Sequence, residues 1–299
     1  MRGWRLVAGA ALLVLAAVVA AGLWLSRPLR LPLDAFAGLE GDAGRGERVF
    51  WAAGCASCHA GEEAEGEARL VLAGGQAFPS AFGTFYAPNV SMDAEHGIGG
   101  WDLARFADAV QRGVSPEGAH YYPVFPYTAY ALAEPGDVAD LWAFWRTLPA
   151  ADAPSRAHDL GFPFNVRRGV GLWKRLHVPD GWAVAGPLAP EAERGRYLAE
   201  ALAHCGECHT PRGPLQGLDR ARWFEGAPNP TGPGRIPAIT PDRLTWSEQE
   251  VAQYLADGFT PDFDSAGGHM ASVIRNLARL PDADRAALAA YVKAVPAGG

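Results

Sequence analysis

The chain has 299 residues, of which 49% are hydrophobic and 20% charged, and its formal net charge is −7. This length suits two folded domains, and the composition excludes a disordered chain, a collagen and a membrane protein with many spans. The negative charge also argues against a general nucleic-acid surface.

The first expected element is a membrane anchor over residues 1–30. Leu6 to Leu25 form an uncharged apolar run that, at a rise of about 1.5 Å per residue, just spans a bilayer core. Arg2 and Arg5 precede the run, which favours a cytoplasmic N-terminus. A signal peptide begins in the same way, but the run is long for one and no clear small-residue cleavage site follows it. We therefore favour an uncleaved anchor, and with either interpretation the rest of the chain is exported.

The exported part, from residue 31 on, carries 22 basic and 33 acidic residues and repeats one pattern twice. Cys55-Ala-Ser-Cys58-His59 corresponds to Cys205-Gly-Glu-Cys208-His209, and Asp137–Pro149 corresponds to Asp284–Pro296. The alignment has one flaw, because Gly46 lies nine residues before its cysteine pair whereas Gly195 lies ten before the second pair. The repeat predicts two domains, 38–150 and 188–299, joined by a basic linker over 151–187.

Each copy is predicted to be helical. Asp102 can cap a helix over Leu103–Gln111 that stops at Gly113, and the capping box Ser247-Glu-Gln-Glu250 begins a helix that stops at Gly258. The last helices of the copies are expected over Val138–Leu148 and Arg285–Val295, where apolar residues recur at i, i+3, i+4 spacing. A few short helices joined by long loops form only a small hydrophobic core, so another group must fill the centre of each domain.

The two C-x-x-C-H segments are typical attachment sites of c-type haem. Thiols one helical turn apart can each bond a haem vinyl group, and the next histidine then ligates the iron. A four-cysteine zinc site needs pairs about 15–20 residues apart, and redox C-x-x-C sites need a βαβ context; both are absent here. We therefore expect two covalently bound haem c groups, held by Cys55, Cys58 and His59 and by Cys205, Cys208 and His209.

The second axial ligands are expected to differ between the copies. Met270 lies twelve residues after Gly258, where a loop can fold over the second haem, and is the expected ligand there. A gap-filling core methionine, or coordination by the neighbouring His269, are the alternatives. The corresponding position in the first copy is Phe125, which cannot bind iron. His120 is the first candidate there; an open or water-bound iron, Met92 and His96 are the others.

Four longer motifs accompany these segments: Ala87-Pro-Asn-Val90 with Gly97-Ile-Gly-Gly-Trp101, Tyr122-Pro with Pro126-Tyr127, Pro163-Phe-Asn-Val-Arg167, and His204-Cys-Gly-Glu-Cys-His-Thr-Pro-Arg212. Over residues 40–295 the chain resembles the cytochrome c subunits of membrane-bound bacterial dehydrogenases, those of alcohol and gluconate dehydrogenases above all. In that family a methionine stands at the place of Phe125, and the alcohol-dehydrogenase type carries three haems. Cytochromes with phenylalanine there also accompany molybdenum hydroxylases, so the partner stays open.

The resemblance implies haem c, a periplasmic location and electron transfer. The expected fold class is all-α, with two tandem class-I cytochrome c domains after a single transmembrane helix in the inner membrane. The expected function is to carry electrons from a periplasmic dehydrogenase to quinone, an oxidase or another cytochrome, without bond-breaking chemistry. The alternative is a dihaem enzyme, of peroxidase or thiosulfate-oxidising type, that uses an open first haem.

The basic linker has two interpretations. Between Arg156 and His177 it carries five basic residues against Asp159, with aromatic residues interleaved. It can be a strap whose aromatic residues pack between domains and whose arginines pair with haem propionates, or a docking face for a partner or the membrane surface. We favour the strap.

Overall fold

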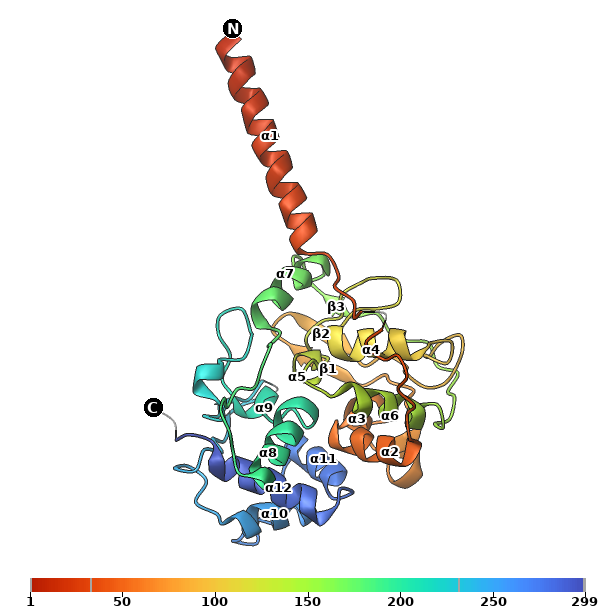
Figure 1. Cartoon of the computed structure of the whole chain (residues 1–299), viewed down its shortest axis with the longest axis vertical. Helices are drawn as coiled ribbons and strands as arrows, with labels where there is room; N and C mark the ends of the chain where they lie inside the picture. The colour runs from red at the N-terminus through yellow and green to blue at the C-terminus, as the bar shows by residue number, and fades with distance from the viewer. Residues whose placement is uncertain (1, 33, 231, 298–299) are drawn as a thin grey trace.

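The computed structural model describes residues 2–32, 34–230 and 232–297, and most of its regular structure is helical (Figure 1). The helices are α1 (Arg2–Leu25), α2 (Ala43–Ala52), α3 (Cys55–His59), α4 (Leu103–Arg112), α5 (Tyr127–Tyr130), α6 (Pro135–Trp145), α7 (Arg168–His177), α8 (Pro190–Tyr197), α9 (Gly206–His209), α10 (Glu248–Asp257), α11 (Gly268–Leu277) and α12 (Asp282–Ala294). Short 3-10 turns cover Gly66–Leu70 and Arg220–Arg222.

Two small antiparallel sheets correct the expectation of a chain built from helices alone. β1 (Ala77–Ser80), β2 (Gly83–Tyr86) and β3 (Asp159–Leu160) form one sheet, and β4 (Ala227–Pro228) and β5 (Arg235–Ile236) form the other. Ala77 pairs with Tyr86 and Gly83 with Leu160. These strands have only two to four residues, too few for an alternating apolar pattern to show in the sequence.

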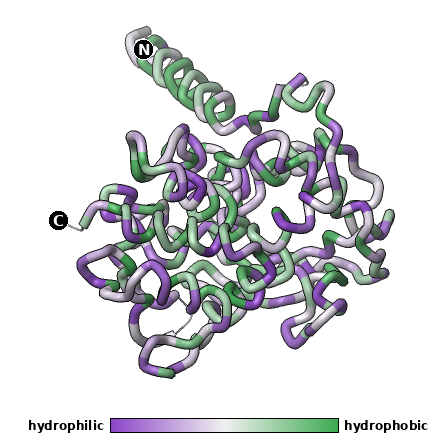
Figure 2. Tube along the Cα trace, turned by 60° about the horizontal axis from the view of Figure 1, so that its bottom comes forward, coloured by the Kyte–Doolittle hydropathy of each residue, from purple (hydrophilic) through white to green (hydrophobic). Residues whose placement is uncertain are grey.

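Helix α1 projects from the body (Figures 1 and 2). Its segment Gly3–Leu25 is long and apolar enough to cross a membrane, and none of its most apolar window is buried within the chain. Trp4 and Trp24, near the two ends of the helix, are both exposed. Figure 2 shows the helix as a mostly apolar rod beside a body in which polar and apolar segments alternate.

The body contains two helix pairs of the same design, α2 with α6 and α8 with α12. Each pair crosses at a glycine, and a Cβ added to Gly46 would lie 1.9 Å from the carbonyl oxygen of Asp140. A Cβ added to Gly195 would lie 1.8 Å from the carbonyl oxygen of Ala287, which is the position aligned with Asp140. Only glycine lets the backbones approach this closely, so the aligned glycines have the same physical role in both copies.

Substitution of Gly46 by alanine is therefore expected to destabilise the fold. Overpacking of this kind costs about 1–3 kcal/mol of stability. The higher helix propensity of alanine offsets only about 1 kcal/mol of this cost. The matched control is Gly136→Ala in α6, where an added Cβ meets nothing within 4 Å and stability should hold or rise. Thermal unfolding of both variants measures the difference, and equal melting temperatures would contradict the close crossing.

The misalignment before the second cysteine pair has a local cause. Leu198–Leu202 form a π turn in which the amide of Ala203 donates to the carbonyl of Leu198, five residues back, at 2.7 Å. At the corresponding place Ala53 donates to Val49, four residues back, at 2.8 Å. The extra residue is thus absorbed as a π bulge while the cysteine pair keeps its position.

Candidate functional site

The two C-x-x-C-H segments form the short helices α3 and α9, and each begins after a residue in the left-handed region. Gly54 has φ 68° and His204 has φ 42°. The conformation suits glycine, but for histidine it costs roughly 1–2 kcal/mol. The His204 ring lies edge-on to Tyr130 at 5.8 Å, and its Nε2 would be 3.8 Å from a Cβ on Gly54. A strained histidine thus sits where the two segments meet.

The two candidate proximal histidines are held in the same way. Nδ1 of His59 lies 3.0 Å from the carbonyl oxygen of Pro88, and Nδ1 of His209 lies 2.8 Å from that of Pro237. Because a carbonyl can only accept, each Nδ1 carries the proton and each Nε2 keeps its lone pair for a metal. Burial lowers the pKa of both rings, which favours the neutral form that ligates iron.

The cysteines of the two segments lie near one another. Burial, with a further contribution from Cys208, raises the pKa of the Cys58 thiol to about 11. Burial likewise raises the pKa of Cys205 to about 12, with Cys208 again a smaller cause. All four cysteines are free of disulfides. Two thiols and an imidazole on one helical turn fit the needs of a c-type haem in each segment.

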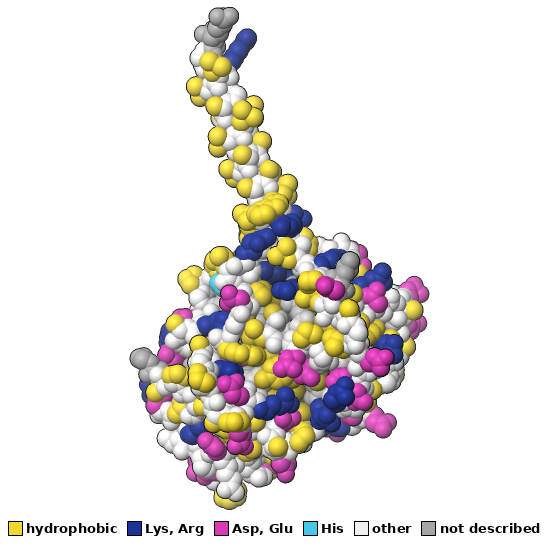
Figure 3. All heavy atoms as spheres, viewed as in Figure 1, with side chains coloured by type: hydrophobic (Ala, Val, Ile, Leu, Met, Phe, Trp, Pro, Cys, Tyr) yellow, Lys and Arg dark blue, Asp and Glu magenta, His cyan; other side chains and the backbone are white. Residues whose placement is uncertain are grey.

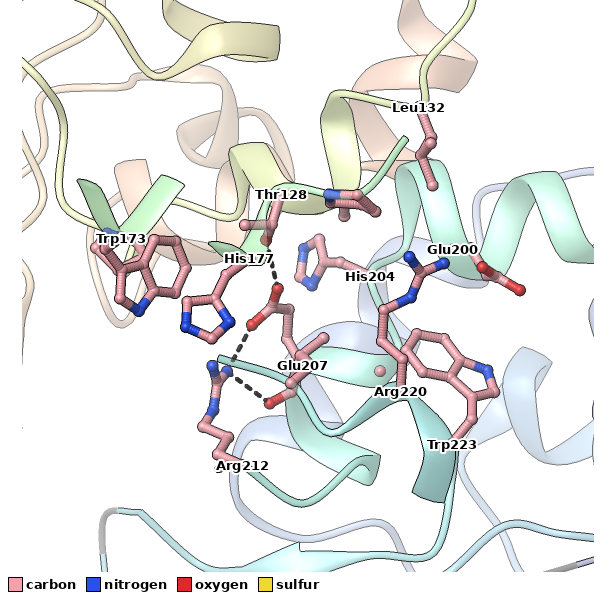
Figure 4. Close-up of a pocket in the computed structure, with 15 residues that line it drawn as sticks. Thr128, Leu132, Trp173, His177, Glu200, His204, Glu207, Arg212, Arg220 and Trp223 are labelled. Atoms are coloured by element: carbon pink, nitrogen blue, oxygen red, sulfur yellow. Dashed lines mark hydrogen bonds and ion pairs between the residues drawn. The ribbon is translucent and has the colours of Figure 1, made fainter. Parts of the chain in front are cut away.

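Reciprocal hydrogen bonds join the two segments to the opposite halves of the body. Ser57, inside the first segment, contacts the hydroxyl of Ser272 at 2.9 Å and accepts from the Asn276 side chain at 2.8 Å. Glu207, at the same place in the second segment, accepts from the hydroxyl of Thr128 at 2.8 Å (Figure 4). Each segment is therefore tied to the chain that follows the candidate axial position of the other copy.

Glu207 lies in a pocket between the two halves of the body. Figure 4 shows its carboxylate between Thr128 and Arg212, with His204 and Trp223 also lining the pocket. Arg212 donates to Glu207 at 2.5 Å, so the carboxylate has a charged partner. A paired, hydrogen-bonded carboxylate is stable in such a half-buried place.

The structure separates the two candidate ligands of the second copy. Met270 is half-buried at the start of α11 and packs against the hydrophobic core. Its neighbour His269 is exposed and lines a surface hollow with Glu62 and Gln76. The thioether, rather than the imidazole, is thus the group directed at the core.

Aromatic rings surround Phe125, the residue at the corresponding position of the first copy. Its ring centroid lies 6.1 Å from that of Tyr121, 6.2 Å from that of Tyr127 and 5.9 Å from that of Tyr130. The hydroxyl of Tyr127 is buried and has no hydrogen-bond partner among the described residues. The neighbourhood is therefore mainly aromatic, with the Lys174 ammonium 4.4 Å from the Tyr127 ring.

The other candidate ligands of the first copy have different surroundings. His120 is 3% exposed, and its Nε2 lies 2.8 Å from the carbonyl oxygen of Ser26 at the end of α1. His96 pairs with Asp152 at 3.5 Å, and Met92 is half-buried against the core. None of these contacts brings a nitrogen or sulfur atom to His59, so coordination by these residues stays a prediction.

Sequence reasoning gave no role to several residues that shape the site. Pro88 belongs to the motif Ala87-Pro-Asn-Val90, and Pro237 stands at the aligned place of the second copy. The motif alone did not show that the carbonyl groups of these prolines fix the imidazoles. The contacts of Ser57, Asn276 and Thr128 join residues far apart in the chain, so no local sequence pattern predicts them.

Comparison with known proteins shows the family. The family described as Cytochrome c matches residues 192–296. A protein named Diheme cytochrome c-type, from Cereibacter sphaeroides, is 59% identical over 292 residues, 98% of each chain. The Fructose dehydrogenase cytochrome subunit of Gluconobacter japonicus is 37% identical over 85% of this chain, and the Gluconate 2-dehydrogenase cytochrome c subunit of Pantoea cypripedii is 31% identical over 85%.

This chain spans 52% of the Gluconobacter protein and 59% of the Pantoea protein, so it matches little more than half of those relatives. The resemblance to dehydrogenase cytochrome c subunits is confirmed, and such subunits imply electron transfer. The thiols and imidazoles described above fit the cofactor of the family. The chain has two covalently bound haem c groups as its cofactors, and it belongs to the family of dihaem c-type cytochromes and dehydrogenase cytochrome c subunits.

Proposed function

We propose that the chain is a membrane-anchored periplasmic cytochrome that passes single electrons from a dehydrogenase toward the respiratory chain. It does so through two haems in tandem class-I cytochrome c domains, 38–150 and 188–299. The observation that carries this proposal is that each C-x-x-C-H segment is hydrogen-bonded to the opposite half of the body, Ser57 to Ser272 and Asn276 and Glu207 to Thr128. Two redox groups in halves joined by such hydrogen bonds suit electron transfer better than two isolated sites.

The proposed haem-binding residues follow from the geometry of the segments. Thioether bonds from the cysteines fix each haem, whose iron changes by one electron between its ferric and ferrous states. The proline carbonyls fix the imidazole planes, so the ligand does not reorient when the charge changes. The first haem is assigned to Cys55, Cys58 and His59, and the second to Cys205, Cys208, His209 and Met270.

The first haem is proposed as the site without a methionine ligand. Phe125 stands there with its ring 5.9–6.2 Å from three tyrosine rings and has no atom that can bind iron. A catalytic use of an open first iron would need a polar group placed over it, and Nε2 of His120 is already bonded to Ser26. The named relatives are cytochrome subunits, so the enzymatic alternative is not favoured.

The proposed location rests on α1 and on Arg2 and Arg5, which precede its apolar run. The helix has the length of a membrane span, and the two arginines before it favour a cytoplasmic N-terminus with the body exported. Names of relatives that include fructose and gluconate dehydrogenase support a dehydrogenase as the donor. Quinone, an oxidase or another cytochrome is the proposed acceptor.

Spheroplasts of cells that make the holoprotein test this proposal. Haem-stained protein should remain with carbonate-washed membranes, and added protease should degrade its body, since the body faces the periplasm. In the same membranes both haems should be reduced by one-electron donors and reoxidised through the respiratory chain. Release by carbonate, or haems that stay reduced while the chain respires, would contradict anchoring or electron carriage respectively.

A further inference from the structure

Helix α7 of the basic linker is fastened to the end of α1. A Cβ added to Gly171 would lie 2.4 Å from the carbonyl oxygen of Ser26, so α7 crosses the chain there at backbone contact. Arg168 donates to the Ser26 hydroxyl at 2.8 Å and to the Leu23 carbonyl at 2.6 Å. Arg175 donates to the Leu25 carbonyl. The arginines satisfy the open carbonyls at the C-terminus of α1 and fix the two helices together.

These contacts set the height of α7 relative to a bilayer. Trp4 and Trp24 are separated by 20 residues, a distance of about 30 Å along a helix and close to the thickness of a bilayer core. Tryptophans at both ends of a span mark the two membrane interfaces. The Arg27 guanidinium lies 4.3 Å from the Trp24 ring and that of Arg175 lies 5.8 Å from it. Arg175 and the rest of α7 therefore lie at the level of the outer interface.

The inner face of α7 is hydrogen-bonded to the body. Lys174 donates to the carbonyls of Arg112 and Gly113 at 2.7 and 2.6 Å. The Trp173 indole donates to the Leu215 carbonyl at 2.7 Å. These bonds fix the helix to the body on one side and leave its other side free of the body.

The outer face combines exposed apolar groups with positive charge. Leu176 is 68% exposed and Leu172, one turn before it, is also exposed, beside Arg168 and Arg175. Phe162, in the preceding loop, is 83% exposed. Further exposed apolar side chains of that loop are Phe164 and Val166. Figure 3 shows dark-blue side chains gathered where α1 joins the body.

This combination is typical of helices that lie in a membrane interface. Apolar side chains enter the boundary of headgroups and acyl chains, and arginines bind anionic headgroups, worth about 1 kcal/mol each near the surface. If these apolar side chains stayed in water, each Å² of their exposed surface would cost roughly 25 cal/mol of free energy relative to burial.

We infer that α7 and the loop before it form a membrane footprint, which rests in the outer surface of the bilayer that α1 crosses and binds anionic phospholipid. The inference rests on the proposed anchoring by α1. The footprint fixes the body against the membrane instead of leaving it on a flexible tether. Helices α10 and α12, at the far end of the body from α1, then face away from the membrane (Figure 1).

Three single-cysteine variants of the full-length holoprotein in lipid nanodiscs test the footprint. The variants are Leu176→Cys in α7, Val14→Cys within α1 and Phe263→Cys, whose parent side chain is 90% exposed in a loop of the body away from α1. The native cysteines bond haem, so a polarity-sensitive fluorophore labels only the new thiol. The nanodiscs contain phosphatidylcholine and phosphatidylglycerol, and matched discs contain the same lipids with brominated acyl chains. The fluorescence of each label is compared between the two kinds of disc. Because quenching by haem is the same in both, it cancels in this comparison.

The Val14 and Leu176 labels should lose fluorescence to the brominated lipid, and the Phe263 label should not. Without phosphatidylglycerol, quenching at Leu176 should weaken while that at Val14 is unchanged. An unquenched Leu176 label beside a quenched Val14 label would overturn the footprint and leave the anchor intact. An unquenched Val14 label would overturn the anchor itself, so the two failures are distinct. Quenching at Phe263 equal to that at Leu176 would show nonspecific adsorption and also overturn the footprint.

Discussion

Replacement of Met270 by alanine is expected to lower the reduction potential of one haem and to leave the other unchanged. A thioether ligand favours the ferrous state, and axial ligands set haem potentials over a range of ~0.8 V. Met270, half-buried against the core, is the proposed second ligand of that haem, and alanine in its place offers no atom that binds iron. The altered haem should become high-spin. Potentiometric titration with optical and electron paramagnetic resonance spectra measures both effects.

Met92→Ala is the matched control, because Met92 is the other half-buried methionine that packs against the core. Both variants remove the same side-chain volume, so a general loosening of the core would affect them alike. Only Met270→Ala should change the spin state. An unchanged titration of Met270→Ala, or a change at the same haem in Met92→Ala, would contradict the assignment of Met270 as the ligand.

The double substitution of Cys55 and Cys58 by alanine should yield a protein with one covalent haem instead of two. The vinyl groups of the first haem then have no thiol to bond, while Cys205 and Cys208 are untouched. Intact mass after denaturation counts the covalent haems directly. The free energy of unfolding should also fall, because a group that binds only the folded state stabilises that state.

The control for this prediction is Ser57→Ala within the same segment. It removes the contacts to Ser272 and Asn276 but leaves both thiols and His59 in place. Both haems should be retained, with a loss of stability of about 1 kcal/mol for the missing hydrogen bonds. Two haems in the double cysteine variant would show that the assumed attachment of the first haem is wrong.

Local signals in the sequence predict the ends of α4 and α10 well, whereas α6 and α12 begin three residues before their predicted starts and Met270 lies in helix α11 instead of a loop. Asp102 accepts from the Arg105 amide at the start of α4, and Gly113 ends that helix with φ 58°. The capping box of Ser247 and Glu250 is present at α10, and Gly258 ends it with φ 82°. Caps are decided by neighbours in the chain, which is why they can be read without a structure.

Features that depend on distant contacts could not be predicted. Helix α7 lies in a segment without a counterpart in the repeat, and the close approach of its Gly171 to Ser26 depends on the position of α1. His204 has a left-handed backbone conformation, which histidine disfavours, and its ring packs against Tyr130. The pairing of Ser57 with α11 joins residues more than 200 positions apart.

In the candidate site, too, local features were predictable from the sequence and features that depend on distant contacts were not. The thiols and histidines were predictable because haem attachment needs five adjacent residues. The single-residue misalignment before Cys205 was visible in the sequence, but its resolution as a π turn was not. In that turn Glu200 is buried and accepts from the amides of Ala183 and Val184, which fixes the linker to the second half of the body.

The most direct test of the account is a reversible potentiometric titration of the wild-type holoprotein, followed in the visible haem bands. Two unlike haems in one electron carrier predict two one-electron steps of equal amplitude at different potentials, the upper one belonging to the haem with the methionine ligand. A single step that contains both haems, or one haem that stays oxidised over the whole respiratory range, would contradict the account.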